Sequence, residues 1–132
     1  MKVVARRREG FAHDVEIEGG HAIRVDEPVG SGGADTGPSP TRLVAAGLAG
    51  CIAITIEMYA ERKGWGVGAV EVDVDVEYDD YLPTSFAASI HLSGDLSAER
   101  RARLLTIAGR CPVHKLLAGE TPVAISYRVE TP

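Results

Sequence analysis

The sequence is poor in cysteine and in long apolar runs. Only two of its 132 residues are cysteines, Cys51 and Cys111, which is too few for a secretory disulfide framework. The longest apolar stretch, residues 43–56, is shorter than the roughly 20 residues of a membrane span. Residues 1–10 lack the apolar core of a signal peptide. We therefore expect a cytoplasmic protein with no membrane partner.

An excess of positive charge is also missing. The formal net charge is −5, which disfavours a nucleic-acid partner because such proteins usually carry a basic field. The one basic run, residues 6–8, is typical of a solvated strand edge. Hydrophobic residues make up 45% and charged residues 25%, an ordinary globular mixture. With no internal repeat, the chain is expected to form a single domain over residues 1–132.

Alternating hydrophobicity and turn residues indicate a mixture of strands and helices. The predicted strands are residues 2–8, 12–18 and 21–25, a hairpin over 70–93, and a last strand over 123–129. The predicted helices are residues 40–63, 97–109 and 111–119. Ser39 and Pro40 suit the start of the first helix, and Gly64 suits its end.

The first predicted helix is apolar on every face over most of its length. Such a helix is normally buried all round, and its many small residues would let other backbone approach closely. A 132-residue monomer has few strands with which to cover it. We therefore expect a homodimer, in which the second copy covers the rest of the helix.

Cys111 has the sequence context of a reactive thiol. It directly precedes Pro112, the expected first residue of a helix, and a helix N-terminus favours the thiolate. Arg110 adds positive charge if its side chain turns inward, and His114 lies one turn further on. A plain helix cap with a surface histidine is the alternative.

Cys51 lies within the apolar helix, where a free cysteine is usually a small buried hydrophobe. Paired with Cys111, it would instead allow a sulfenic acid on one thiol to be resolved by the other. A metal site from Cys51, Cys111 and His114 lacks the close ligand pairs of structural zinc. A Cys-His hydrolase lacks an oxyanion element. These two interpretations are therefore disfavoured, while the redox pair and a purely structural pair of cysteines both remain, with no metal and no cofactor expected.

Two segments carry a family resemblance. GPSPTRLVAAGLAGC (residues 37–51) and CPVHKLL (residues 111–117) resemble the segments at the two cysteines of OsmC/Ohr proteins. The order of the predicted elements fits as well, most closely that of the smaller OsmC-like branch. The resemblance implies an α+β fold in which antiparallel sheets wrap long central helices of an intertwined homodimer, with active sites at the subunit interface.

The resemblance also implies a chemistry. The better-known members reduce organic hydroperoxides as part of an oxidative stress response. Carried over, Cys51 would attack the peroxide and Cys111 would resolve the sulfenic acid as a disulfide. A dithiol such as a dihydrolipoyl protein would then reduce this disulfide. The alternative is a non-enzymatic member, either a thiol redox sensor or a binder of small apolar molecules.

In the family an arginine held by a glutamate activates the first cysteine. Arg8 is the chosen candidate among the three arginines of residues 6–8, because it stands just before a turn. The glutamate positions hold Thr41 and Arg42 instead. Activation of Cys51 should therefore be weaker than in members that have the glutamate.

Overall fold

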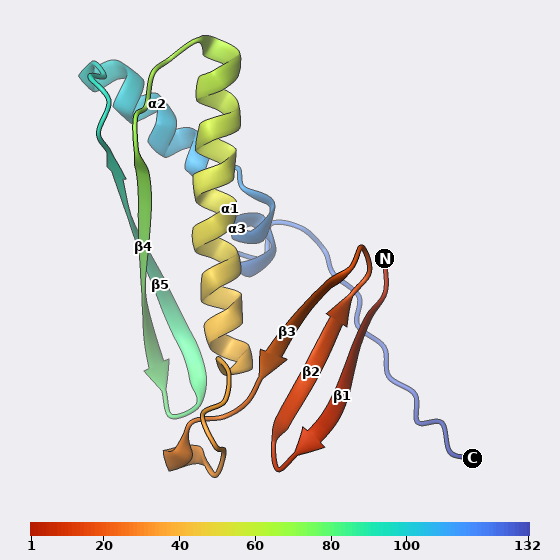
Figure 1. The fold of residues 1–132 in the computed structure, drawn as a ribbon. Coiled ribbons are helices and arrows are strands. Elements are labelled where there is room, and N and C mark those ends of the chain that lie inside the picture. Colours follow the sequence, from red (N-terminus) through yellow and green to blue (C-terminus); the bar gives the residue numbers. More distant parts are fainter. The chain divides into compact units, whose positions relative to one another are not determined.

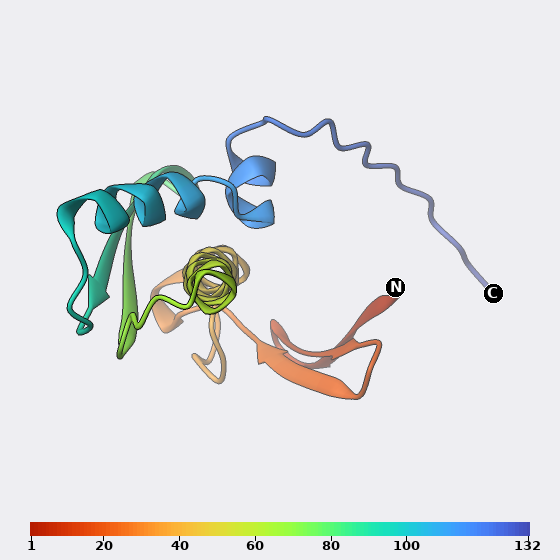
Figure 2. The ribbon, with the colours of Figure 1, turned by 90° about the horizontal axis from the view of Figure 1, so that it is seen from above.

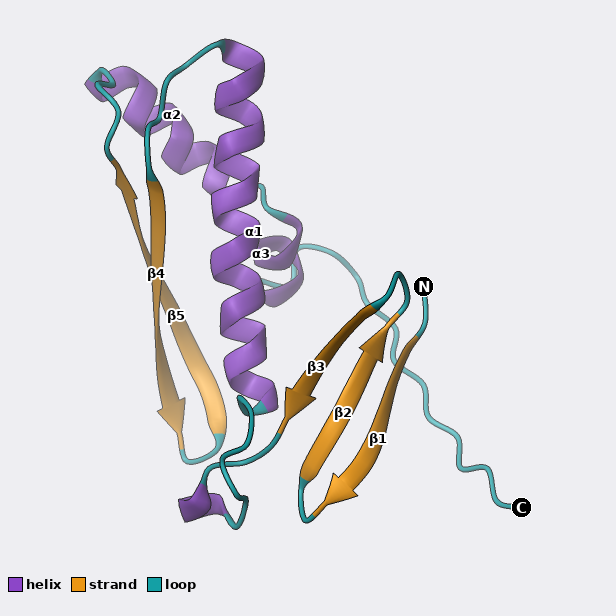
Figure 3. Cartoon of the chain, viewed as in Figure 1, coloured by secondary structure: helices purple, strands orange, loops and turns teal.

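A computed structural model describes all of residues 1–132, and it has an α+β fold with antiparallel sheets and one long helix (Figures 1 and 3). Residues 1–46 and 76–86 form one compact unit, and residues 47–75 and 87–132 form the other. The fold class predicted from the sequence is confirmed. The single domain over residues 1–132 stays a prediction.

The first unit is built on a three-stranded antiparallel sheet in the order β1-β2-β3. The strands are β1 (Val3–Glu9), β2 (Ala12–Ile17) and β3 (His21–Val25), each within one residue of its predicted bounds. Gly10 has a φ of 57°, in the left-handed region that glycine adopts without strain, and this allows the tight turn between β1 and β2. The alternating patterns correctly predicted these strands.

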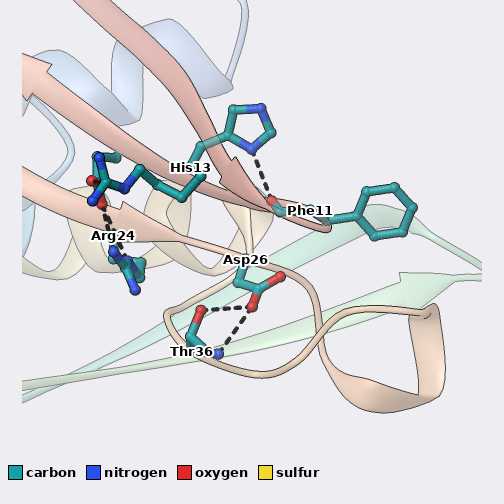
Figure 4. A network of polar contacts seen from close by, with 7 residues as sticks. Phe11, His13, Arg24, Asp26 and Thr36 are labelled. Atoms are coloured by element: carbon teal, nitrogen blue, oxygen red, sulfur yellow. Dashed lines mark hydrogen bonds and ion pairs between the residues drawn. The ribbon is translucent and has the colours of Figure 1, made fainter.

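A buried carboxylate organises the loop between β3 and the long helix. Asp26 is 1% exposed, and Thr36 donates both its hydroxyl and its backbone N–H to Asp26 Oδ2, at 2.7 and 3.1 Å (Figure 4). The N–H of Glu27 binds Oδ1 at 2.7 Å. These bonds, the Thr36 hydroxyl first among them, outweigh burial and lower the pKa of Asp26 to about 2.

Replacing Asp26 with asparagine is expected to lower the melting temperature at pH 7 by several degrees, because the charge-assisted bonds are lost. The native pKa is depressed, so ionised Asp26 stabilises the fold above its unfolded pKa, near 3.8. That contribution should disappear as pH falls from about 4 to 2. Melting temperatures of wild type and Asp26→Asn should therefore converge toward pH 2, whereas the exposed Asp95→Asn control should match wild type near neutral pH.

The long helix α1 (Pro40–Lys63) has the bounds predicted from its capping residues. At its C-terminus, Gly64 has a φ of 69°, and its N–H binds the carbonyl of Glu61 at 3.1 Å. The N–H of Trp65 binds the carbonyl of Ala60 at 2.9 Å. This pair of bonds is a Schellman motif, which ends the helix and folds the next residues back over it.

Within a single chain α1 is buried on one side only, and burial of its other faces by a second copy stays a prediction. Its buried residues form one stripe at intervals of four: Leu48, Ile52, Ile56 and Ala60. Ile54 and Met58, on another face, are 57% and 59% exposed. One copy of the chain supplies too few elements to cover the whole helix. By length and by a mean hydropathy of 1.8, α1 also meets the criteria for a membrane span, so the expectation of no membrane partner stays a prediction.

The second unit contains most of α1 together with two shorter helices, α2 (Ala98–Ala108) and α3 (Pro112–Leu117). Ser97 caps α2 by accepting the N–H of Arg100 at 3.2 Å, so this helix begins where the sequence predicted. Viewed down α1, both short helices lie on one side of it (Figure 2). Leu104 and Ile107 of α2 are buried with the α1 stripe and form the core of this unit.

The hairpin predicted over residues 70–93 is present as β4 (Val70–Asp79) and β5 (Leu82–Leu92). The predicted strand over residues 123–129 is absent. The chain after α3 is a loop to its end (Figure 3). Tyr127 and Val129 are 92% and 91% exposed. Alternation alone does not make a strand, since a strand also needs a neighbouring edge with which to form hydrogen bonds.

Candidate functional site

The site is built around the two cysteines, both in the second unit and both free thiols. Cys51 lies on α1 beside the buried stripe and is itself half-buried. A methyl group added at Gly47 or Gly50 would meet no atom within 4 Å. The small residues near Cys51 therefore leave open space in this chain, rather than the close backbone approach expected from the sequence.

Cys111 occupies the N-cap of α3, with Pro112 at the first helical position as predicted. Its Sγ accepts a hydrogen bond from the backbone N–H of His114 at 3.2 Å, and the residue is 0% exposed. Cysteine thus takes the place of the usual serine or aspartate cap. The cap fixes the sulfur at the start of the helix, out of solvent.

The prediction that Cys111 is the low-pKa thiol is wrong. Burial raises the pKa of Cys111, since an apolar surrounding disfavours the thiolate. The N–H groups of His114 and Val113 act in the opposite direction but are outweighed. An interaction with the Cys51 thiol raises the pKa of Cys111 further.

The effect of Cys51 on the pKa of Cys111 indicates that the two thiols lie near each other. Cys51 comes from α1 and Cys111 from the cap of α3, and the Cys51 thiol is near enough to raise the pKa of Cys111. One half-exposed thiol against one buried thiol is an arrangement that can carry two-step thiol oxidation.

The ring of His114 is not directed at the sulfur. Its Nε2 lies 3.8 Å from Glu120 Oε2, and only its backbone N–H reaches Cys111. The hydrolase and metal alternatives both require that ring at the thiols. The geometry therefore favours the redox pair over these two alternatives.

A different group of potential ligands was missed from the sequence. Glu71, Asp73 and His91 place one ligand atom each within 4.8 Å of one another, on adjacent strands of the hairpin, and all three are exposed. His91 Nε2 lies 2.9 Å from Asp73 Oδ2. Glu71 and Asp73 share a face of β4, but only the pairing of β4 with β5 brings His91 beside them.

Arg8 lies on β1 in the first unit. Its Nε is 3.0 Å from Asp14 Oδ2, while the other oxygen of Asp14 binds Arg24 at 3.0 Å. Arg6 pairs with Glu16 at 2.6 Å. Arg8 thus has a carboxylate partner from the neighbouring strand, Asp14, instead of a glutamate near residue 41. The activating role of Arg8 stays a prediction.

Comparisons with known proteins agree on one family. A sequence profile described as OsmC-like protein matches residues 32–126. No curated protein matches the chain. The OsmC-like protein from Mycoplasma pneumoniae is similar in structure, with a TM-score of 0.76 and 18% identity, over 89% of this chain and 86% of that chain.

Two further structures are named for hydroperoxide resistance. The organic hydroperoxide resistance protein OsmC of Legionella pneumophila has a TM-score of 0.66 and 22% identity, over 90% of each chain. The organic hydroperoxide resistance protein OhrB of Bacillus subtilis has a TM-score of 0.62 and 26% identity, over 89% of this chain and 90% of that chain. These similarities extend over nearly the whole fold.

Proposed function

Because the chain belongs to the OsmC-like protein family, we propose that it is a thiol-dependent peroxidase that reduces organic hydroperoxides. The observation that carries the proposal is the proximity of half-buried Cys51 to buried Cys111, whose pKa it raises. The similarity to the Bacillus subtilis organic hydroperoxide resistance protein supports the choice of substrate.

The reaction proceeds in three balanced steps. The Cys51 thiolate attacks the outer oxygen of ROOH, the O–O bond breaks, and the alkoxide takes a proton and leaves as ROH. Cys51 is then a sulfenic acid, oxidised by two electrons. The Cys111 sulfur displaces water from it, forming the disulfide, and a dithiol reductant of the dihydrolipoyl type restores both thiols while becoming a disulfide itself.

The environments of the two thiols suit these roles. Cys51 is the more accessible of the two, and small residues leave space beside it for a substrate. Cys111 is shielded from solvent, and its raised pKa keeps it protonated and unreactive toward peroxide. Cys111 reacts when a sulfenic acid forms on the neighbouring Cys51. The proximity of the two sulfur atoms then compensates for the low nucleophilicity of the Cys111 thiol.

The test is steady-state consumption of cumene hydroperoxide with dihydrolipoamide as reductant. Slow but sustained turnover is expected, because Thr41 and Arg42 replace the glutamate implied by the resemblance. If the protein is oxidised once and then stops while reductant remains in excess, the thiol redox sensor becomes the better function. If neither thiol is oxidised, the proposal fails.

We further assign the activating guanidinium to Arg8, oriented by Asp14 in place of the glutamate. Arg8→Ala should lower kcat/KM roughly ten- to a hundredfold, since a charge-assisted hydrogen bond to a thiolate is worth about 1.5–3 kcal/mol. Arg6→Ala, which removes the same charge and a comparable ion pair from the same strand, is the control and should retain near wild-type activity. Equal losses in both variants would exclude a specific role for Arg8.

A cytoplasmic homodimer is the proposed working form. The exposed apolar face of α1, with Ile54 and Met58, and the unpaired segment 121–132 are the surfaces that a second copy would cover. Sedimentation should then give twice the 14.0 kDa chain mass.

The alternative of binding a small apolar molecule has one observation in its favour. A cavity of about 490 Å³ in the first unit is lined mainly by apolar side chains, among them Phe11, Val15 and Ile23. Its volume falls in the range of small-molecule sites. Saturable binding of a hydrophobic dye that Val15→Asp abolishes, in a protein without peroxidase turnover, would favour this function.

A further inference from the structure

A cluster of cations and aromatic rings lies at the C-terminal end of α1, in the second unit and outside the thiol site. It consists of Tyr59, Arg62, Lys63, Trp65, Arg100 and Arg103. The peroxidase chemistry proposed above uses none of these residues. We call this group the cationic cluster.

The end of α1 builds the aromatic part of the cluster. The Schellman motif at Gly64 folds the chain back, so that Trp65 packs against Tyr59 with ring centroids 5.6 Å apart and an interplanar angle of 72°. This contact between the residue after the turn and the last helical turn commonly accompanies the motif. The edge-to-face pair fixes both rings in place.

The rings in turn hold the positive charges. The guanidinium of Arg100 lies 5.0 Å from the centre of the Trp65 ring, and that of Arg103 lies 5.6 Å from the centre of Tyr59. Arg103 Nε also donates to the Tyr59 hydroxyl at 3.0 Å, which lowers the pKa of Tyr59. Arg103 is therefore held by two contacts while its terminal N–H groups remain available.

Arg62 and Lys63, from the last turn of α1, complete the positive side. They lie 6.0 and 5.6 Å from the centre of the Tyr59 ring. Lys63 and the more distant Arg110 also contribute to the lowered pKa of Tyr59, which reports a positive potential at its hydroxyl.

No carboxylate neutralises these four cations. None of them forms an ion pair within the second unit, whereas Arg6, Arg8 and Arg24 each pair with an acidic side chain. Four cations with no ion pair are thus gathered in one place in a chain of net charge −5. Their mutual repulsion would be relieved by a bound anion.

Five of the six residues of the cluster, all but Arg62, line a cavity of about 630 Å³, which has the size of a small-molecule site. Ser97 and Thr106 add hydroxyl groups to its wall, and Glu99 adds one carboxylate. The Ser97 oxygen already accepts the N–H of Arg100, so its own O–H is left to donate to a ligand. A cavity of this volume exceeds the needs of a single phosphate.

From this arrangement we propose that the cationic cluster binds a diphosphate group, either as a free oligophosphate or as part of a nucleotide. Guanidinium groups match phosphate oxygens with two parallel hydrogen bonds, and rings that hold them in position reduce the entropy lost on binding. Several cations around one cavity call for a ligand with more than one negative charge. The site is separate from the thiol pair, so this proposal does not depend on the proposed peroxidase activity.

The test uses Trp65, the only tryptophan of the chain, as its reporter. Titrating the full-length protein with pyrophosphate or ADP, at ionic strength held constant with chloride, should change its fluorescence along a saturating curve. Calorimetry should give the same dissociation constant. Equal affinity for the two ligands would identify the diphosphate as the recognised group, and tighter binding of ADP would identify a nucleotide.

Arg103→Gln and Lys63→Gln should each weaken binding about tenfold or more, as loss of a charge-assisted hydrogen bond does. Arg101→Gln is the matched control, because Arg101 lies on the same helix but lines a different hollow, and it should bind as wild type does. Lys63 lies at the exposed end of α1, so its variant stays informative if Arg103→Gln does not fold. Absence of saturation into the millimolar range, or equal weakening by Arg101→Gln, would overturn the proposal.

Discussion

Replacing Cys51 with serine is expected to abolish hydroperoxide turnover, with a fall in kcat/KM of roughly a thousandfold or more. The oxygen of serine is not ionised at neutral pH and cannot form the sulfenic acid on which the cycle depends. The substitution changes one atom on α1, so the fold and the Cys111 cap should be retained. Consumption of cumene hydroperoxide under steady-state conditions measures the effect.

Undiminished turnover by the Cys51→Ser variant would identify a different nucleophile. If Cys51→Ser turns over as fast as wild type, the nucleophile is Cys111, and the burial that raises its pKa is not decisive. A circular dichroism spectrum equal to that of wild type is the control for folding. Loss of turnover in a protein that retains its helices would assign the effect to the missing thiol.

Replacing Cys111 with serine is expected to separate the first step from the second. Cys51 should still react with one equivalent of hydroperoxide, at a rate close to that of wild type. It should then remain a sulfenic acid or oxidise further to the sulfinic acid, since the resolving sulfur is absent. Serine also accepts hydrogen bonds at an N-cap, so α3 should keep its cap.

Mass spectrometry of the Cys111→Ser protein after peroxide treatment would show this as an added 16 or 32 Da, the mass of one or two oxygen atoms, on the peptide that contains Cys51. The rate at which this variant consumes hydroperoxide with dihydrolipoamide as reductant should fall sharply with repeated exposure to hydroperoxide, because more of the protein becomes over-oxidised. If the Cys111→Ser protein instead kept its activity as well as wild type does under the same exposure, the external thiol, rather than Cys111, would resolve the sulfenic acid.

Local signals in the sequence predicted the elements well. Ser39 and Pro40 marked the start of α1, Gly64 its end, and Ser97 the cap of α2. Each of these residues meets a backbone requirement that depends on its immediate neighbours alone. Strands β1 to β3 were predicted for the same reason, because alternation and turn glycines are local features.

The errors concern features that depend on distant parts of the chain. Apolar and polar residues alternate over residues 123–129 as they do in a strand, but one copy of the chain provides no strand edge with which this segment could pair. The apolar face of α1 that includes Ile54 is also exposed in one copy, and the homodimer that would cover it stays a prediction. A sequence pattern shows what a segment prefers, but not whether a partner is present.

The thiol site was predicted in part. The two cysteines were identified, and the fold brings them near each other. The pKa of Cys111 was predicted in the wrong direction, because the helix N-terminus was considered without the burial that outweighs it. Asp14 was missed as the partner of Arg8, since that pair forms across a strand turn rather than at helical spacing.

Identifying a disulfide between Cys51 and Cys111 is the most direct test of whether the two thiols form a redox pair. Wild-type protein is treated with one equivalent of cumene hydroperoxide, its remaining thiols are blocked, and it is digested with trypsin without reductant. The expected product joins residues 43–62 to residues 111–115 and is absent before oxidation, with no crosslinked chains on a non-reducing gel. Recovery of both peptides as blocked free thiols after hydroperoxide treatment would contradict the redox pair.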